Sequence, residues 1–421
     1  MIHGSYSRFQ ILYSKFNYFF IFLFVFLLPT QLGKHFFLPF SYLSGVRVDY
    51  LAPTIYLTDL FALVLILVNW KNIFKQVKQS YISLLFSIFF LLLVIFNILQ
   101  SPIWQIALYR WIKVVEWLAM FIIFKKLINR KLFLLIIYAF LAGTVFQTTL
   151  SLLQFISAHS LQGIFYWFGE RAVNLSLPDI AKASFQGNEF LRPYGTFSHP
   201  NSMAGFYLLL YFWVTIIKLP SKKWFLQPLL QMFCSILILL SFSKITIITW
   251  VVLNGLYLLQ KNNWTCKVCT LAKIITPLII GLIFINIQSD PLSLQKRFIL
   301  VNDAISIFLK HPFGVGLGNY LVAQNQITNQ FKEYFLQPVH NIFLLWLSEA
   351  GIAITLLATG LAMVLARIDK LWRHSGVWIV LVIFITGTFD HYWLTLQQNW
   401  LLTAVVFGLI INKYETTQPN N

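Results

Sequence analysis

The sequence predicts an all-α integral membrane protein that crosses the bilayer about twelve times. Hydrophobic residues make up 58% of the 421 positions and charged residues only 10%, whereas soluble domains average about 45–50% and about 25%. The apolar residues are grouped in runs of about 17 to 25, the length at which a helix spans a hydrocarbon core of about 30 Å. A β-barrel would require shorter segments of alternating hydrophobicity. We therefore expect one polytopic helical domain over residues 1–421.

The hydrophobic segments follow one another with short connections, apart from two. They cover residues 17–31, 53–70, 80–99, 104–124, 132–157, 201–217, 224–241, 245–260, 268–287, 341–364, 375–389 and 393–411. The first segment is followed by Lys34 and His35 rather than by a small-residue cleavage site, so we expect a retained helix and not a signal peptide. The two long connections, 158–200 and 288–340, are expected to be functional, because long loops in compact proteins usually are.

Lysine and arginine set the predicted orientation. If the N-terminus is cytoplasmic, more than half of the 31 basic residues fall in segments on the cytoplasmic side, as the positive-inside rule requires. We therefore expect both termini in the cytoplasm and both long connections outside. The net charge of +18 is then a set of topogenic signals beside anionic lipid headgroups, and nucleic-acid binding is not expected.

The first motif closes the first long connection. Residues 192–204 read RPYGTFSHPNSMA, in which Pro200 and Asn201 favour the start of a helix. A helix N-terminus presents free N–H groups and a positive dipole, and Arg192 adds a fixed charge, so the motif suits a phosphate. The alternative is an interfacial helix cap with a snorkelling arginine.

The second motif lies in the second long connection. Residues 297–320 read RFILVNDAISIFLKHPFGVGLGNY, and the apolar spacing as far as Lys310 predicts an amphipathic helix at the membrane surface. After Pro312 comes a Gly-x-Gly-x-Gly run that includes Gly316 and Gly318. It resembles a phosphate loop, but no strand precedes it and no Gly-Lys-Ser follows, so a nucleotide site is not expected. The glycines are expected to allow a tight backbone path near a substrate or a neighbouring helix.

The third motif opens the span 341–364. Residues 340–353 read HNIFLLWLSEAGIA, which places His340 at the outer membrane boundary, where an imidazole can act as a base near neutral pH. Glu349 lies about 13.5 Å deeper along the same helix, so the two are not expected to be direct partners. A carboxylate at that depth should face the bundle interior, either at a functional site or as a structural ion pair or protonated hydrogen-bond donor.

Taken in this order and spacing, the three motifs resemble the O-antigen ligase family, which also includes many O-antigen polymerases and bacterial O-oligosaccharyltransferases. The resemblance covers residues 192–353. It implies a GT-C-like fold and an inverting, metal-independent glycosyltransferase without a cofactor, in the bacterial cytoplasmic (inner) membrane with its active site on the outer face. The donor would be a glycan on undecaprenyl diphosphate, and the acceptor a hydroxyl of a glycan, lipid or protein.

The resemblance also implies roles for individual residues. Arg192 and Arg297 match the two arginines that would hold the departing diphosphate, and His340 matches the histidine that would orient or deprotonate the acceptor hydroxyl. The further candidates for substrate binding within the motifs are Asn201, Asn341, Gly316 and Gly318; Asn341 can instead cap the helix that it precedes. No metal is expected, because the outer side has no Asp-x-Asp pair for a hard cation and Cys266 with Cys269 forms only a lone Cys-x-x-Cys pair.

Several charges fall within predicted spans. Arg110, Lys113 and Glu116 have the spacing of neighbours on one helix face. With Glu349, the two cations are candidates for binding the acceptor or the lipid diphosphate, although a buried structural pair is an equal alternative. The same alternatives apply to Asp59, Asp390 and His391. A transporter is the rival function, but transporters usually place their sites at midplane on broken helices, whereas these motifs gather at outer loops.

The predicted orientation can be tested by labelling. Cysteines placed at Gly163 and Asn325 should react with a membrane-impermeant maleimide added outside, because both lie in the long connections. Cysteines placed at Lys75 and Lys222 should react only after the membrane is permeabilised. The reverse pattern would contradict an extracytoplasmic site.

Overall fold

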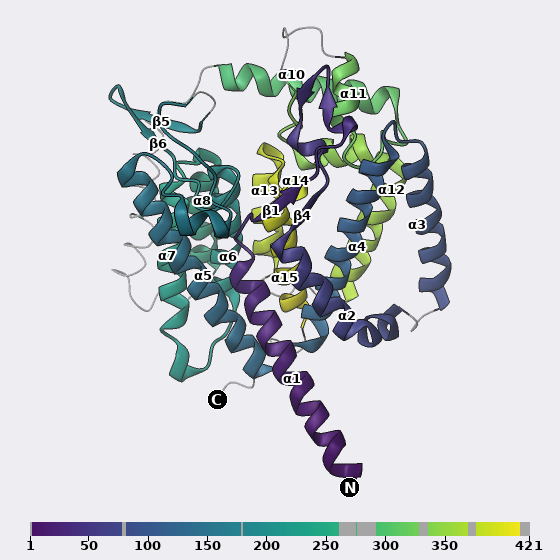
Figure 1. Cartoon of the computed structure of the whole chain (residues 1–421), viewed down its shortest axis with the longest axis vertical. Coiled ribbons are helices and arrows are strands. Elements are labelled where there is room, and N and C mark those ends of the chain that lie inside the picture. The colour runs from purple at the N-terminus through teal and green to yellow at the C-terminus, as the bar shows by residue number, and fades with distance from the viewer. Residues whose placement is uncertain are drawn as a thin grey trace.

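The computed structural model of the chain describes residues 2–77, 81–177, 180–260, 275, 292–327, 336–368 and 376–412. Most of these residues are helical, and most of the helices lie side by side with their axes roughly aligned (Figure 1). Helix α1 begins, and helix α15 ends, at the same end of this bundle. The bundle helices are α1 (Ile2–Leu27), α2 (Leu57–Val77), α3 (Tyr81–Leu99), α4 (Trp104–Leu127), α5 (Arg130–Ser157), α6 (Pro200–Ile216), α7 (Leu226–Leu240), α8 (Lys244–Gln260), α12 (Ile342–Ile368), α13 (Val377–Phe389) and α15 (Gln397–Ile411).

The helices agree with the predicted spans wherever the chain is described. Only the predicted span 268–287 falls outside the described residues, apart from position 275. Within the described part, four helices are long and apolar enough to cross a membrane, namely Leu57–Lys75, Arg130–Ser157, Ser221–Leu240 and Ile342–Val364, and further apolar helices have 10–17 residues. A helical membrane fold is therefore confirmed, while the number of twelve spans stays a prediction.

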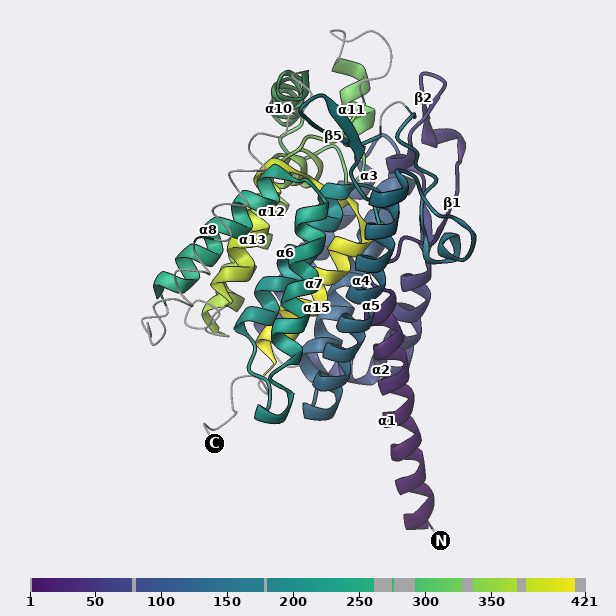
Figure 2. The ribbon, with the colours of Figure 1, turned by 90° about the vertical axis from the view of Figure 1, so that its left-hand side faces the viewer.

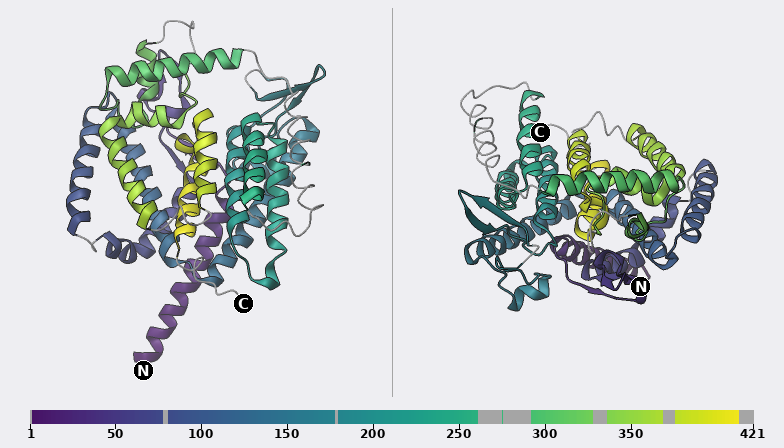
Figure 3. Two further views of the ribbon diagram at one scale, coloured as in Figure 1. Left: turned by 180° about the vertical axis from the view of Figure 1, so that it is seen from behind. Right: turned by 90° about the horizontal axis from the view of Figure 1, so that it is seen from above.

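The opposite end of the bundle carries shorter elements. Helix α10 (Leu292–Lys310) crosses over the ends of the bundle helices, as the view from above shows (Figure 3), and α11 (Tyr320–Ile327) lies beside it (Figures 1 and 2). The amphipathic segment that begins near Arg297 is thus a helix, as predicted. A hairpin of β5 (Lys182–Phe185) and β6 (Asn188–Leu191) precedes the first motif.

The connection between α1 and α2 is more structured than the sequence analysis predicted. Strand β1 (Gly33–His35) pairs with β4 (Thr54–Tyr56), and between them β2 (Tyr42–Leu43) pairs with β3 (Val46–Arg47). The turn between β2 and β3 is Ser44–Gly45, both with positive φ, which is the backbone that a two-residue hairpin turn requires. The Ser-Gly pair in the sequence is compatible with such a turn, but two residues are a weak indication next to the long hydrophobic runs on either side.

Helix α6 lies deep in the hydrophobic core. Its aromatic residues Phe206, Tyr207, Phe212 and Trp213 are all buried, and it packs against α7, α13 and α15. At Gly205 an added Cβ would lie only 2.3 Å from the ring of Tyr392. The absence of a side chain there lets the short helix α14 (Tyr392–Thr395) approach the first turn of α6.

Helix α12 is broken at Gly351, whose φ of 79° is not helical. The glycine run of the second motif packs into this break: Val315 N–H donates to Ser348 O and Gly316 N–H donates to Glu349 O, both at 2.9 Å, and Ile352 N–H donates to Pro312 O at 2.9 Å. These bonds satisfy carbonyl and amide groups that the break leaves without helical partners. The glycines were expected to allow a tight backbone path near a substrate or near a neighbouring helix. At Gly316 the structure shows the path beside a neighbouring helix.

Candidate active site

The three motifs meet around the turn between α13 and α14. Arg192 follows β6, Asn201 lies in the first turn of α6, and His340 lies two residues before the start of α12. Asp390 and His391 form the turn itself. Residues far apart in the sequence therefore approach one another at the end of the bundle that α10 crosses (Figure 1).

A chain of hydrogen bonds joins the first motif to this turn. Arg192 Nη2 donates to Asn201 Oδ1 at 2.6 Å, and Asn201 Nδ2 donates to Asp390 Oδ2 at 3.0 Å. Arg192 Nε also donates to Ser241 O at 2.8 Å. Burial lowers the pKa of the Arg192 guanidinium to about 10, so it stays charged near neutral pH. The Asn201 amide thus connects a fixed cation to a fixed carboxylate.

The third motif faces the same carboxylate. His340 Nδ1 lies 3.7 Å from Asp390 Oδ1, slightly beyond hydrogen-bond distance, and this buried nitrogen has no hydrogen-bond partner among the described residues. The His340 and His391 rings lie side by side with centroids 5.0 Å apart, and Tyr50 packs edge-on against His391 at 5.7 Å. A small inward movement would make His340 and Asp390 a hydrogen-bonded pair.

Burial and neighbouring groups set the protonation of the cluster. Burial lowers the pKa of the His391 imidazole to about 4, and burial with the charge of Arg192 lowers that of His199 to about 3. Burial by itself would raise the pKa of the Asp390 carboxyl, but the imidazoles of His340, His391 and His199 outweigh it and hold that pKa well below its ordinary value. Near neutral pH, Asp390 is therefore ionised and the two buried imidazoles are neutral.

Two further motif residues attach to the end of α13. Arg297 Nη1 donates to Phe389 O at 3.1 Å, and Asn341 Nδ2 donates to Thr388 O at 3.2 Å. Asn341 Oδ1 also accepts the backbone N–H groups of Phe343 and Leu344, both at 3.0 Å. Asn341 is therefore a helix cap that fastens α12 to α13, and its role in substrate binding stays a prediction.

A cavity of about 1360 Å³ opens beside this cluster, larger than the about 300–1,000 Å³ of most small-molecule sites. Of the predicted site residues, it is lined by Asn201, His340, Gly318, Arg110, Lys113 and Glu349. Arg192, Arg297, Asn341 and Gly316 are not among its lining residues, whereas Arg171 and Lys296 are. The β2–β3 connection forms another part of the wall with Tyr50, so the segment missed by the sequence analysis contributes to the site.

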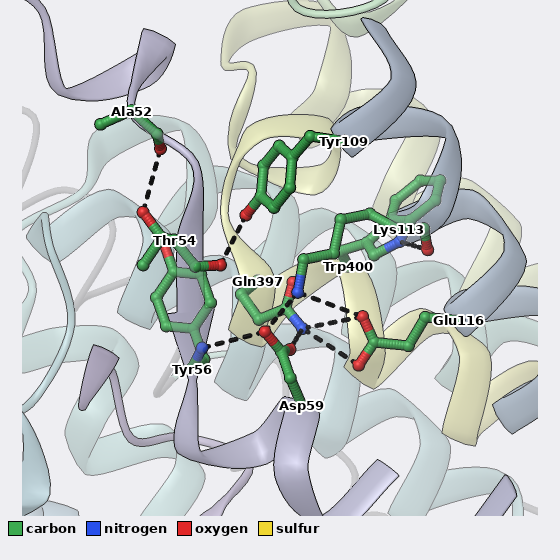
Figure 4. Close-up of polar contacts among 9 residues, drawn as sticks. All are labelled: Ala52, Thr54, Tyr56, Asp59, Tyr109, Lys113, Glu116, Gln397 and Trp400. Atoms are coloured by element: carbon green, nitrogen blue, oxygen red, sulfur yellow. Dashed lines mark hydrogen bonds and ion pairs between the residues drawn. The ribbon is translucent and has the colours of Figure 1, made fainter. Parts of the chain in front are cut away.

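The inner end of the cavity holds a buried ion-pair network (Figure 4). Lys113 Nζ lies 2.5 Å from Asp59 Oδ2 and 3.2 Å from Glu116 Oε2. Asp59 also accepts the backbone N–H of Tyr56 at 2.9 Å and the side-chain amide of Gln397. Each charge thus has a partner, as buried charges require. The contacts favour the structural alternative for Glu116 and Asp59, while Lys113 both belongs to the network and lines the cavity.

The other two intramembrane candidates lie nearer the glycine run. Arg110 Nη2 donates to Tyr50 O at 3.3 Å, which supports the cavity wall. Glu349 Oε1 accepts the backbone N–H of Tyr320 at 3.4 Å, next to the break in α12. Both side chains remain available to a ligand in the cavity, and their role in substrate binding stays a prediction.

Asp390 and His391 have no role that could be assigned from the sequence alone. In the structure, Asp390 contacts the first and third motifs, and His391 completes a group with His340 and Asp390 whose potential metal-ligand atoms lie within 4.8 Å of one another. The available signal was an Asp-His pair between two hydrophobic spans, which is costly unless the pair is held by partners.

Comparison with known proteins supports the resemblance that the motifs predicted. Residues 201–359 match the family model described as O-antigen ligase. This range contains Arg297 and His340, and it begins after Arg192. No curated protein matches the chain in sequence. The match indicates a bacterial membrane protein with a glycosyltransferase-type function and with a lipid-linked glycan and an acceptor as its general partners. The match over residues 201–359 therefore supports the O-antigen ligase family that the three motifs predicted.

Proposed function

We propose that the protein transfers a glycan from undecaprenyl diphosphate to an acceptor hydroxyl at the outer face of the cytoplasmic membrane, with inversion and without a metal. The observation that carries this proposal is the placement of His340 beside the ionised Asp390 at the wall of the large cavity. A base next to a carboxylate is the arrangement that takes a proton from a hydroxyl in many enzymes. The family match supports the class of reaction.

The reaction requires one proton acceptor and one anion-stabilising group. The acceptor oxygen attacks the anomeric carbon, the bond from that carbon to the diphosphate oxygen breaks with its electron pair, and the hydroxyl proton passes to His340. Since Nδ1 of His340 faces Asp390, a proton on Nδ1 leaves the lone pair on Nε2 for this step. The Asp390 charge then stabilises the imidazolium that forms.

The departing diphosphate needs positive charge that is already in place. Arg192 and Arg297 flank the Asp390 turn, one held by Asn201 and Ser241 O and the other by Phe389 O. Neither lines the cavity in this structure, so direct contact with the diphosphate requires their side chains to turn when the donor binds. Arg171 and Lys296, which line the cavity, would add charge on the same side.

Ligation to a lipid, polymerisation of a glycan and O-glycosylation of a protein share this donor chemistry and differ in the acceptor. The transporter alternative has one structural feature in its favour, the broken helix α12. Against it, the predicted catalytic residues lie together at one end of the bundle and not at the break. We therefore retain the transferase as the proposed function.

Replacing Arg192 or Arg297 by lysine tests the diphosphate role. Each change keeps the charge but removes the fork that can grip two oxygens, so we expect most transfer activity to be lost while the protein inserts at a normal level. Arg130→Lys, at the exposed start of α5, is the control and should be neutral. Full activity of both site variants would exclude a role of the two arginines in diphosphate binding. A loss of protein level as large as the loss of activity would indicate a structural role.

His340 is tested by two substitutions with purified protein, an undecaprenyl-diphosphate glycan and an added acceptor. His340→Ala should bind the donor almost as the wild type does but transfer it more slowly by a factor of about 10² to 10⁴, because proton transfer acts only in the transition state. His340→Gln can orient a hydroxyl but cannot take its proton. Near-normal turnover of His340→Gln would mean that the imidazole only positions the acceptor, and near-normal turnover of His340→Ala would exclude a catalytic role.

A further inference from the structure

At the turn between α13 and α14, His391 lies next to the His340–Asp390 pair, and the proposed transfer makes no use of His391. His340, Asp390 and His391 each offer one ligand atom, and these atoms all lie within 4.8 Å of one another. Ligands of a tetrahedral zinc ion at about 2.0–2.1 Å are themselves about 3.4 Å apart. The pair His340 Nδ1 and Asp390 Oδ1, at 3.7 Å, is already close to that spacing, so a modest contraction would complete the set.

The contacts around His391 are compatible with the tautomer that a metal requires. Thr395 Oγ1 lies 3.2 Å from His391 O, to which it can donate, and 2.8 Å from His391 Nδ1. When the hydroxyl proton points to the carbonyl, the hydroxyl oxygen accepts the Nδ1 proton. In that arrangement Nε2 of the neutral His391 ring carries the lone pair. Metal-binding histidines characteristically donate their other N–H in this way.

The other two proposed ligands, Asp390 and His340, are also placed to bind an ion. Asp390 Oδ2 is held by Asn201 Nδ2 at 3.0 Å. Asp390 Oδ1 accepts the backbone N–H of His391 at 2.8 Å and faces His340 Nδ1 at 3.7 Å. The Nδ1 atom of His340 is buried and without a hydrogen-bond partner among the described residues, so a bound ion would replace no existing bond of that atom. Both His340 and His391 line the cavity, which gives an ion a path of entry and a fourth position for water.

The ligand set decides which ion fits. Two imidazoles and one carboxylate suit a first-row ion such as Zn²⁺ and do not suit Ca²⁺ or Mg²⁺, which prefer oxygen ligands. Arg192 and Arg297 lie nearby and oppose a cation, while the Asp390 charge favours it. Occupancy should therefore depend on the ion concentration, as for a regulatory site rather than a permanently filled one.

We propose that His340, Asp390 and His391 form an inhibitory site for a zinc-type divalent cation. A metal bound to His340 Nδ1 displaces the proton from that nitrogen and leaves the ring proton on Nε2. Nε2 then has no lone pair for the hydroxyl proton of the acceptor. The inhibition rests on the proposed transferase function, whereas binding of the ion does not.

The binding part is tested with Co²⁺, whose visible absorption reports a tetrahedral site, on the untagged full-length protein. Cys266 and Cys269 are replaced by serine throughout, to remove their thiolates as competing ligands. We expect one Co²⁺ per chain, displaced by Zn²⁺. His391→Gln should weaken binding at least tenfold, and Thr395→Val, which removes only the hydroxyl that holds the ring, by about 10- to 100-fold. His311→Gln, which changes an exposed histidine outside the cluster, should leave binding unchanged.

Absence of the Co²⁺ spectrum in the parent protein would overturn the site, as would unchanged binding in both His391→Gln and Thr395→Val. If His391→Gln does not fold, Thr395→Val decides the question. Inhibition is measured as the Zn²⁺ concentration that halves the transfer rate, relative to the metal-free rate of the same protein. In Thr395→Val this concentration should rise by the same factor as the dissociation constant for the metal ion. Binding without inhibition would refute the inhibitory role. Failure of every variant and the parent to transfer glycan would count against the proposed function, while the Co²⁺ measurement would still decide the metal site.

Discussion

The arrangement of the site depends on one buried carboxylate, that of Asp390. A charge in a bundle of apolar helices is unfavourable unless it is hydrogen-bonded or paired. Here Asn201 supplies one bond and the backbone N–H of His391 another, and His340 faces the remaining side. These partners belong to the start of α6, the α13–α14 turn and the start of α12, so satisfying the carboxylate brings together the ends of three helices that the sequence keeps far apart.

Packing elsewhere makes this meeting possible. Gly205 lets Tyr392 lie against α6, which positions the turn that carries Asp390. The break at Gly351 lets the glycine run insert beside α12, which shapes the cavity near Gly318. At the inner end, the Lys113 network joins α2, α4 and α15 (Figure 4). The cavity is thus enclosed by contacts that neutralise buried charges, and its outer wall is completed by the hairpins between α1 and α2.

The sequence predicts most of the helices, because long apolar runs with basic residues at their ends are a strong signal that needs no tertiary information. It also predicts roles for His340, Arg192 and Arg297, because the motifs have characteristic spacing. It does not reveal the role of Asp390, because the Asp-His pair gains its meaning only from contacts with Asn201 and His340, 189 residues away in the first case.

The hairpins between α1 and α2 were missed for a different reason. Their strands have two or three residues each, and strands so short are stabilised by the helices beneath them and not by their own sequence. Likewise, the position of Arg192 behind Asn201 and outside the cavity follows from its bonds to Asn201 and Ser241. Charge and motif spacing indicate that such an arginine matters, but they do not distinguish direct contact with a ligand from support of a neighbouring side chain.

The most direct test of this account is the single-turnover rate of Asp390→Asn in lipid nanodiscs with an undecaprenyl-diphosphate-linked glycan and excess acceptor. The amide has nearly the same shape as the carboxylate and can still accept a bond from Asn201, so the change removes chiefly the charge. We expect unchanged donor affinity and a transfer rate lower by at least about 10², because the imidazolium of His340 loses the group that stabilises it. Transfer by Asp390→Asn at the wild-type rate would contradict this account.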